Sequence, residues 1–232
     1  MFALASPNHC GVLNKQGTDM IVTIGNTKGG VGKSTLAVQA AITRAIEGRR
    51  VWLIDADRQG TSYLAMQARA QAGHLPLMAC DHLHDWRELE AQIEAKAAGF
   101  DDVLIDVGGY DNAAFRVALV LSDRLVIPTA PRAYDFWALD DVQAVIQLVR
   151  PKNPRLQVRV MLSCADTTGS DNAAAMAALQ QFDGIEYQAT PVTRRKSIAK
   201  AAGMGLSVLE TKPKDKKAID EVRGFTSALF AL

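Results

Sequence analysis

Short apolar runs alternate along this chain with longer segments in which apolar residues recur every three or four positions. Short runs bounded by turn residues are typical of buried strands, and the longer period is that of an amphipathic helix. We interpret as strands residues 20–25, 51–55, 103–106, 125–128, 158–162 and 185–188, with a weaker strand expected at 75–79. We interpret as helices residues 34–47, 62–72, 86–98, 113–121, 136–149, 172–182, 197–202 and 215–230. Because continuous apolar strands separated by helices form parallel sheets, the pattern predicts an α/β fold: a mostly parallel twisted sheet with helices on both faces, in three layers.

Residues 1–19 fall outside this periodic pattern and contain turn-forming residues such as Pro7, Gly11 and Gly17. We expect them to be an irregular N-terminal extension, or to precede a functional start at Met20; an ordered N-terminal arm is the alternative. No repeat or linker interrupts the rest of the sequence, so we expect residues 20–232 to form a single domain.

The composition is that of an ordinary globular protein, with 48% hydrophobic and 22% charged residues. The cysteines Cys10, Cys80 and Cys164 are far apart in the sequence, which favours a reducing cytoplasm over a disulfide framework. No apolar run approaches the roughly 20 residues of a membrane span, and we expect no signal peptide. The apolar end of the last helix, 224–232, contains no lysine, so we expect that helix to pack on the sheet rather than on a membrane.

Charge is distributed unevenly along the chain, although the net charge is only +1. Residues 1–149 carry 13 Lys and Arg against 17 Asp and Glu, whereas residues 150–232 carry 13 against 8. The C-terminal third is therefore the candidate region for a polyanionic partner, with an ordinary solvated surface as the alternative.

The segment most informative about chemistry is residues 27–35, TKGGVGKST, between the first expected strand and the first expected helix. Its glycines let successive main-chain N–H groups converge on phosphate oxygens, and the start of the helix adds a positive dipole. The segment therefore predicts a P-loop that binds ATP with Mg²⁺ through Lys28, Gly29, Gly30, Val31, Gly32, Lys33, Ser34 and Thr35. Within it we expect Lys33 to reach the β- and γ-phosphates, Ser34 to coordinate Mg²⁺ and Thr35 to contact the α-phosphate.

Aspartates mark the ends of the next two firm strands: Asp55, with Asp57 close behind it, and Asp106. Ligands of parallel sheets bind at the carboxyl ends of the strands. An apolar strand that ends in Asp106 has the Walker B arrangement, which holds Mg²⁺ through water. An aspartate after a strand also caps the following helix, and this alternative stays open for Asp55 and Asp57. Gly108 and Gly109 form either a flexible switch at the γ-phosphate or a tight turn.

Together these motifs resemble the ParA/MinD family of deviant Walker A (P-loop) ATPases, in particular the small ParA-type plasmid and chromosome partition ATPases. The resemblance rests on Lys28 ahead of the glycines, on the DADRQG segment at 55–60, on Asp106, and on the later segments 122–128, 134–138 and 190–192. Two segments depart from the family pattern. Arg58 stands where the family has proline, and Val107-Gly108-Gly109 replaces Thr-Pro-Pro.

The resemblance implies roles for individual residues. Lys28 would act as a catalytic lysine that reaches the nucleotide of the partner subunit, and Asp57 would position or polarise the attacking water. Asp55 would order the magnesium shell together with Ser34 and Asp106, and Pro191 would border the adenine. The activity implied is slow ATP hydrolysis that a partner stimulates.

A basic cluster follows the expected adenine-binding segment. Residues 188–217 contain eight Lys and Arg against two acidic residues. Clustered basic side chains contact phosphates without reading bases. The resemblance implies that Arg194, Arg195, Lys196 and Lys200 bind DNA non-specifically, with a solvated basic face as the alternative.

The leading hypothesis is a ParA-type partition ATPase: an ATP-dependent homodimer that binds non-specific DNA, responds to a ParB-like adaptor, and is cytoplasmic and nucleoid-associated, with no membrane contact. The alternative is a related ATPase that positions a non-DNA cargo or acts at a membrane, and a metabolic synthetase on the same scaffold is a third class. The Cys80-x-His82-x-His84-Asp85 tract looks like a metal site, but ligands at this spacing in a loop rarely close a site alone, so we expect none there.

Overall fold

The computed structural model describes residues 17–166, 171–182 and 184–231, with residues 133–138 described by their backbone alone. Its strands are β1 (Met20–Ile24), β2 (Val51–Asp55), β3 (Ala79–His82), β4 (Asp102–Asp106), β5 (Arg124–Thr129), β6 (Gln157–Ala165), β7 (Glu186–Tyr187) and β8 (Val192–Thr193). They form one sheet in the order β3-β2-β4-β1-β5-β6-β7, with β8 paired to β6. Every pairing is parallel, which confirms the expected fold class.

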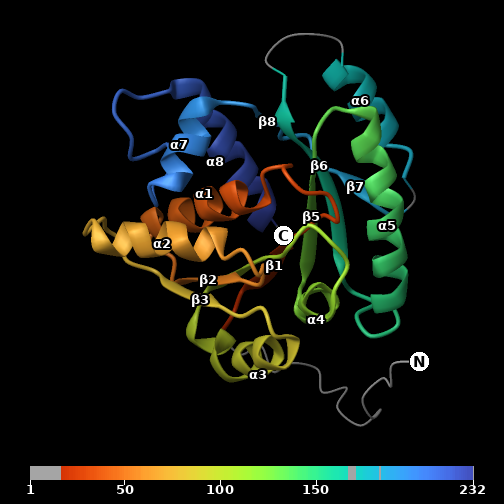
Figure 1. The fold of residues 1–232 in the computed structure, drawn as a ribbon, viewed down its shortest axis with the longest axis horizontal. Helices are drawn as coiled ribbons and strands as arrows, with labels where there is room; N and C mark the ends of the chain where they lie inside the picture. The colour runs from red at the N-terminus through yellow and green to blue at the C-terminus, as the bar shows by residue number, and fades with distance from the viewer. Residues whose placement is uncertain (1–16, 167–170, 183, 232) are drawn as a thin grey trace.

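Helices cover both faces of this sheet (Figure 1). One layer holds α1 (Lys33–Ile46), α2 (Thr61–Gln71), α7 (Lys196–Gly203) and α8 (Lys216–Phe230). The other holds α3 (Trp86–Lys96), the short 3-10 helix η1 (Ala97–Gly99), α4 (Ala113–Leu121), α5 (Ala133–Val149) and α6 (Asp171–Leu179). Because every return from one strand to the next parallel strand has to cross a face, this three-layer arrangement follows from the strand order.

The core is divided by the sheet into two hydrophobic clusters, one under each helical layer. Successive residues of a strand point to opposite faces, so in β1 Ile21 belongs to one cluster and Val22 to the other. Val222, Phe225 and Leu229 of α8 are fully buried in the second cluster. The last helix therefore packs on the sheet, as its pattern predicts.

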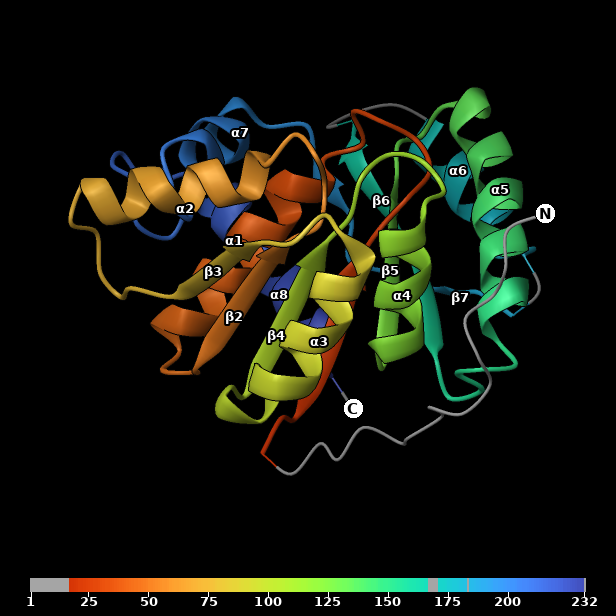
Figure 2. The same ribbon diagram turned by 60° about the horizontal axis from the view of Figure 1, so that its bottom comes forward.

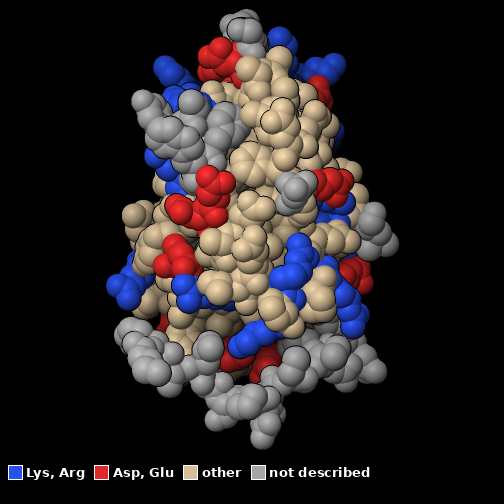
Figure 3. Space-filling model, turned by 90° about the vertical axis from the view of Figure 1, so that its right-hand side faces the viewer, with Lys and Arg blue, Asp and Glu red and all other residues tan. Residues whose placement is uncertain are grey.

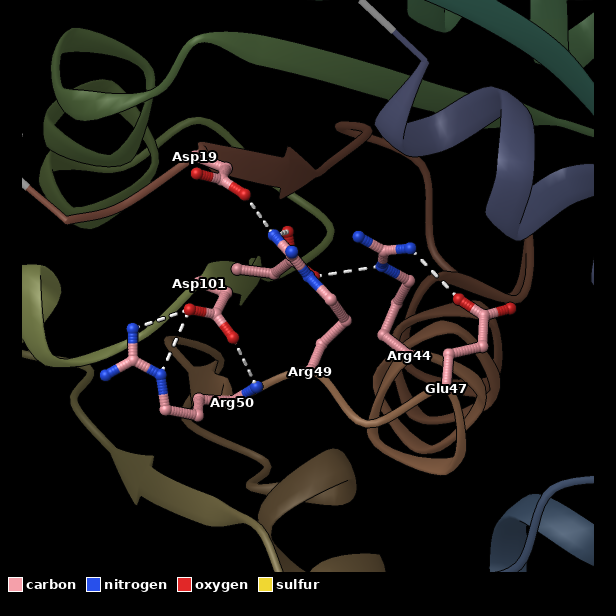
Figure 4. A network of polar contacts seen from close by, with 7 residues as sticks. Asp19, Arg44, Glu47, Arg49, Arg50 and Asp101 are labelled. Atoms are coloured by element: carbon pink, nitrogen blue, oxygen red, sulfur yellow. Dashed lines mark hydrogen bonds and ion pairs between the residues drawn. The ribbon is translucent and has the colours of Figure 1, made fainter.

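An ion network closes the amino-terminal edge of the sheet (Figure 4). Asp102, at the start of β4, is 1% exposed and accepts hydrogen bonds from Arg44 Nε at 2.9 Å and Arg49 Nε at 3.3 Å. Arg49 also pairs with Asp19, and Arg50 Nε donates to Asp101 at 3.0 Å. The Arg50 guanidinium lowers the pKa of Asp101 to about 2. The network joins the end of α1 to the starts of β1, β2 and β4.

The structure differs from the sequence predictions in several places: β8 was not among the expected strands, some helix bounds shift by a few residues, and the edge strand and the N-terminal extension differ as follows. The weak strand expected at 75–79 is wrong: Leu75 and Leu77 are 75% and 63% exposed, and the edge strand begins only at Ala79. The edge strand β3 is the polar run ACDH and its residues are only partly buried, so it lacks the apolar signal that marks a buried strand. The end of the expected irregular extension is bonded to the fold, since Thr18 Oγ1 donates to Ala97 O at 2.5 Å. Residues 1–16 of that extension lie outside the described residues.

In the part of the chain that the structure describes, none of the helices has the length and apolar character of a bilayer span.

Candidate functional site

The predicted site residues meet at the carboxyl edge of the sheet. Figure 2 shows the loop between β1 and α1 lying beside the loop that follows β4 at the upper edge of the molecule. The turn after β2 reaches the same place, because Asp55 and Asp106 are register partners in neighbouring strands. This is the edge at which parallel sheets bind their ligands.

The loop at residues 25–32 has the backbone that a P-loop requires. Gly30 and Gly32 have φ of +75° and +87°, a region in which side chains with a Cβ are strained. A Cβ on Gly32 would also lie 3.1 Å from Ser163 Oγ. Ser163 Oγ itself donates to Val31 O at 2.6 Å, so the end of β6 supports the loop from below. Ser163 was absent from the sequence predictions, since nothing in its local pattern marks it.

The two lysines of the loop lie in different environments. Lys33 is 7% exposed, its Nζ donates to Lys28 O at 2.7 Å, and burial lowers its pKa although Asp106 and Asp57 act in the opposite direction. Lys28 is exposed, and its backbone N–H donates to Asn26 Oδ1 at 2.9 Å. The side chain of Asn26, which no motif in the sequence marks, is in turn anchored because its Nδ2 donates to Pro128 O at 2.8 Å.

Asp106 is the clearest candidate ligand for a cation. Its carboxylate is fully buried, and neither oxygen has a hydrogen-bond partner at bonding geometry, although the hydroxyls of Ser34 and Ser62 lie nearby. Burial and the neighbouring Asp55 raise the pKa of Asp106 to about 7. An unsatisfied buried carboxylate beside a second one fits a divalent cation, because oxygen ligands suit Mg²⁺ and its charge would offset their repulsion. Ser34 and Asp106 would hold the ion.

Asp55 is committed to the backbone of its own turn. Its Oδ1 accepts from Asp57 N at 3.0 Å and its Oδ2 from Tyr63 N at 2.9 Å. These bonds fix the turn after β2 and the start of α2, which is the capping role that the sequence left open. The predicted contribution of Asp55 to the magnesium shell stays a prediction.

Asp57 lies between this turn and the loop after β4. Its Oδ1 accepts from Gln59 N at 3.1 Å, and a Cβ on Gly108 would lie 3.3 Å from its carboxyl group. A Cβ on Gly109 would lie 3.2 Å from the backbone of Gly29. The glycine pair therefore allows this loop to lie directly against both Asp57 and the P-loop, and a larger residue there would push one of these neighbours away.

The predicted DNA-binding residues follow β8, on the side of the molecule that carries α7. Arg194, Lys196 and Lys200 are exposed. Arg195 instead pairs with Glu221 of α8 at 2.7 Å, and Glu221 also accepts from Thr193 N at 3.0 Å. Pro191 is exposed one residue before β8, and its neighbour Val192 is the register partner of Ser163, which contacts the P-loop.

A Gly-rich loop between a central strand and a helix, a buried lysine in that loop and an unsatisfied aspartate on the adjacent strand define a P-loop nucleotide-binding protein. A family model described as ATPase MipZ matches residues 20–154. The chain thus belongs to the MipZ family of the ParA/MinD group, which confirms the resemblance seen in its motifs, and it is an ATPase that uses ATP with Mg²⁺.

Individual relatives are more distant. The chain is 25% identical over 204 residues to the maintenance of carboxysome distribution protein A of Halothiobacillus neapolitanus, covering 87% of this chain and 92% of that protein. It is 27% identical over 219 residues to the chromosome-partitioning ATPase Soj of Thermus thermophilus, covering 83% and 88%. Apo McdA of Cyanothece superposes with a TM-score of 0.75 at 15% identity, over 90% of this chain and 99% of that one, a likeness that concerns the fold.

Proposed function

We propose that this protein is a ParA-type positioning ATPase that closes on ATP as a face-to-face dimer, binds DNA non-specifically in that state, and carries a cargo through an adaptor protein that stimulates hydrolysis. The observation that carries the proposal is the difference in burial between the two P-loop lysines, Lys33 and Lys28. One is buried within the site, and the other is exposed at its rim.

Lys28 is suited to a second subunit rather than to its own. Its backbone is fixed on both sides, by Asn26 Oδ1 at the N–H and by Lys33 Nζ at the carbonyl. Its side chain nevertheless extends into solvent. A cation that approaches the phosphates from outside adds charge at the transition state, and such fingers contribute roughly 10³–10⁵ in rate.

Asp57 is the proposed positioning group for the attacking water. Its carboxyl group lies against Gly108 and within electrostatic reach of Lys33. It is less buried than Asp106, so a water molecule can reach it. Asp106 and Ser34 would meanwhile hold the magnesium ion.

The proposed DNA surface consists of Arg194, Lys196 and Lys200, with Arg195 fixed behind it by Glu221. The opposite side of the molecule has a different character. On the face that carries α5 and α6, Figure 3 shows Lys and Arg mixed with Asp and Glu around a broad uncharged area. Basic side chains contact DNA phosphates without reading bases, so the exposed Arg194, Lys196 and Lys200 favour the α7 side, and this surface would place the protein on the nucleoid.

The cargo distinguishes two versions of this function. Soj is named for chromosome partitioning, which favours a DNA cargo, whereas the Halothiobacillus protein is named for carboxysome distribution, which favours a protein body. Both versions share the ATP-dependent dimer and the DNA surface. Imaging the labelled cargo in cells with and without the protein would separate them.

The Lys28→Ala variant tests the dimer. We expect it to bind Mg-ATP with an affinity close to that of the wild type but to hydrolyse it at least about tenfold more slowly, since only the cross-subunit contact is lost. Turnover at the wild-type rate would exclude the face-to-face arrangement.

DNA binding tests the rest of the proposal. The wild type should bind a DNA duplex of arbitrary sequence in the presence of ATP and should bind it only weakly with ADP. The affinity with ATP should be lower at 200 mM than at about 50 mM salt. The paired Arg194→Glu and Lys200→Glu change should abolish binding while ATP affinity persists. Binding to anionic vesicles but not to DNA would instead support the membrane alternative.

A further inference from the structure

A histidine outside the P-loop lies directly against the turn that carries Asp57. The Nε2 atom of His82, the last residue of β3, is 2.7 Å from the main-chain oxygen of Asp57. A carbonyl oxygen only accepts, so the ring donates from a protonated Nε2. A Cβ on Gly60, which has φ of +64°, would lie 3.3 Å from His82 Cε1. The imidazole therefore fills the space beneath the turn formed by residues 57–60.

The ring is itself held in place from two sides. Tyr63 of α2 stacks on the His82 ring, with the ring centroids 5.7 Å apart and the planes at 24°. The ring centroid of His84 lies 5.1 Å from that of His82. Strand pairing fixes the backbone, because His82 is the register partner of Asp55 and Leu83 N donates to Asp55 O at 2.8 Å. A side chain with this many contacts keeps one orientation, as a positioning group must.

The turn needs such a support because of its sequence. Arg58 follows Asp57 directly, and arginine, unlike proline, restrains neither its own φ nor the residue before it. The Asp57 carbonyl is held by two hydrogen bonds, from His82 and from Gly60 N at 3.1 Å.

We propose that His82 is a positioning residue for ATP hydrolysis: by holding the Asp57 carbonyl from β3, it fixes the direction of the Asp57 carboxyl group toward the phosphate site. The proposal rests on the role of Asp57 in hydrolysis that is proposed above. It assigns His82 to the rate of hydrolysis and not to nucleotide binding, since the P-loop contacts do not involve it.

The test compares His82→Phe, which keeps a stacking ring but lacks the donor, with His82→Gln, whose amide donates from a similar position. We expect His82→Phe to lower kcat about tenfold, with KM and the Kd for Mg-ATP within about twofold of the wild type, because misplacing a reacting group costs rate rather than affinity. His82→Gln should recover most of that loss. His84→Ala keeps the hydrogen bond and the Tyr63 stacking and removes only the outer ring contact, so it should lower kcat far less than His82→Phe does. Retained Mg-ATP binding and an unchanged thermal midpoint show that each variant is folded.

Other outcomes have separate meanings. Wild-type kcat in His82→Phe, or a loss confined to KM, would overturn the positioning role. The Asp57→Ala variant keeps the two proposals distinguishable: wild-type turnover there would refute the hydrolytic role of Asp57 itself. If Asp57→Ala is slow, adding His82→Phe should lower kcat no further, because both changes remove the same group from its place. A further multiplicative loss in the double variant would show that His82 acts elsewhere.

Discussion

The ammonium group of Lys33 and the main-chain carbonyl of Lys28 lie 2.7 Å apart and form a hydrogen bond across the P-loop. The bond satisfies a buried cation within its own loop and, at the same time, fixes the backbone from which Lys28 extends into solvent. The two lysines are thus joined by a hydrogen bond, although Lys33 is proposed to bind the nucleotide of its own subunit and Lys28 that of the partner subunit. Removing either one should have a distinct effect.

Replacing Lys33 with alanine should abolish nucleotide binding. The ammonium of Lys33 is buried within the P-loop, and it interacts electrostatically with Asp106 and Asp57. Charge-assisted bonds of this kind are strong, and we expect the Kd for Mg-ATP to rise about 100-fold or more. Calorimetric titration measures this directly, with Lys28→Ala as the comparison. Retained affinity in Lys33→Ala would contradict the P-loop assignment.

The ionisation of Asp106 should make the stability of the fold depend on pH. The pKa of Asp106 is about 7 in the folded protein, against an ordinary value of 3.8. Between these two pH values the folded protein therefore keeps the Asp106 proton, whereas the unfolded chain has already lost it. Without Mg²⁺, this group therefore stabilises the fold at low pH, and its contribution is lost as the pH rises toward 7, with a slope of at most about 1.4 kcal/mol per pH unit.

Metal binding should show the opposite trend. Mg²⁺ needs the ionised carboxylate, so the affinity for Mg-ATP should fall as the pH drops from 8 to about 6, in contrast to the affinity for metal-free ATP. Asp106→Asn should flatten both dependences. A pH-independent Mg²⁺ requirement in the wild type would argue against Asp106 as the ligand.

Replacing each of two glycines with alanine should change the free energy of unfolding in opposite directions. Gly224 lies inside α8 with open space at its Cβ position, so Gly224→Ala should raise the free energy of unfolding by about 0.5–1 kcal/mol. Gly205 has φ of +66°, and a Cβ there would lie 2.3 Å from Ala65 O. Gly205→Ala should lower stability by more than about 2 kcal/mol, because neither the backbone nor its neighbour on α2 can yield cheaply. Denaturant unfolding of both variants checks the pair.

A buried ion pair should contribute more to the stability of the fold than an exposed one. Arg69 is almost wholly buried in α2 and bonds Glu210 through two nitrogens at 2.9 and 3.0 Å. Glu210→Ala leaves that guanidinium without its anion and should cost about 3 kcal/mol of stability. The Arg50–Asp101 pair has an Arg50 side chain that is 60% exposed, so solvent screens it, and Arg50→Ala should lower stability much less than Glu210→Ala does. Equal losses would mean that burial does not set the value of these pairs.

Much of the site could be predicted from the sequence because the P-loop is contiguous. The spacing of its glycines and lysines between a strand and a helix needs no tertiary information, and Asp106 follows from an apolar strand that ends in a carboxylate. The element order was equally accessible, since the periods of strands and helices are local. The edge strand was misplaced because β3 is polar and is defined by its pairing with β2.

What the sequence determined by itself was therefore the class of fold, the nucleotide loop and the identity of its chemical groups, all of which depend on residues close together in the chain. The tertiary structure decided which groups around the site already have partners: Arg195 is paired with Glu221, Val31 of the P-loop accepts from Ser163, and the main-chain oxygen of Asp57 accepts from His82. The physical reason is that these contacts depend on strand register and side-chain direction. Neither leaves a local pattern when the partners are separated by tens of residues.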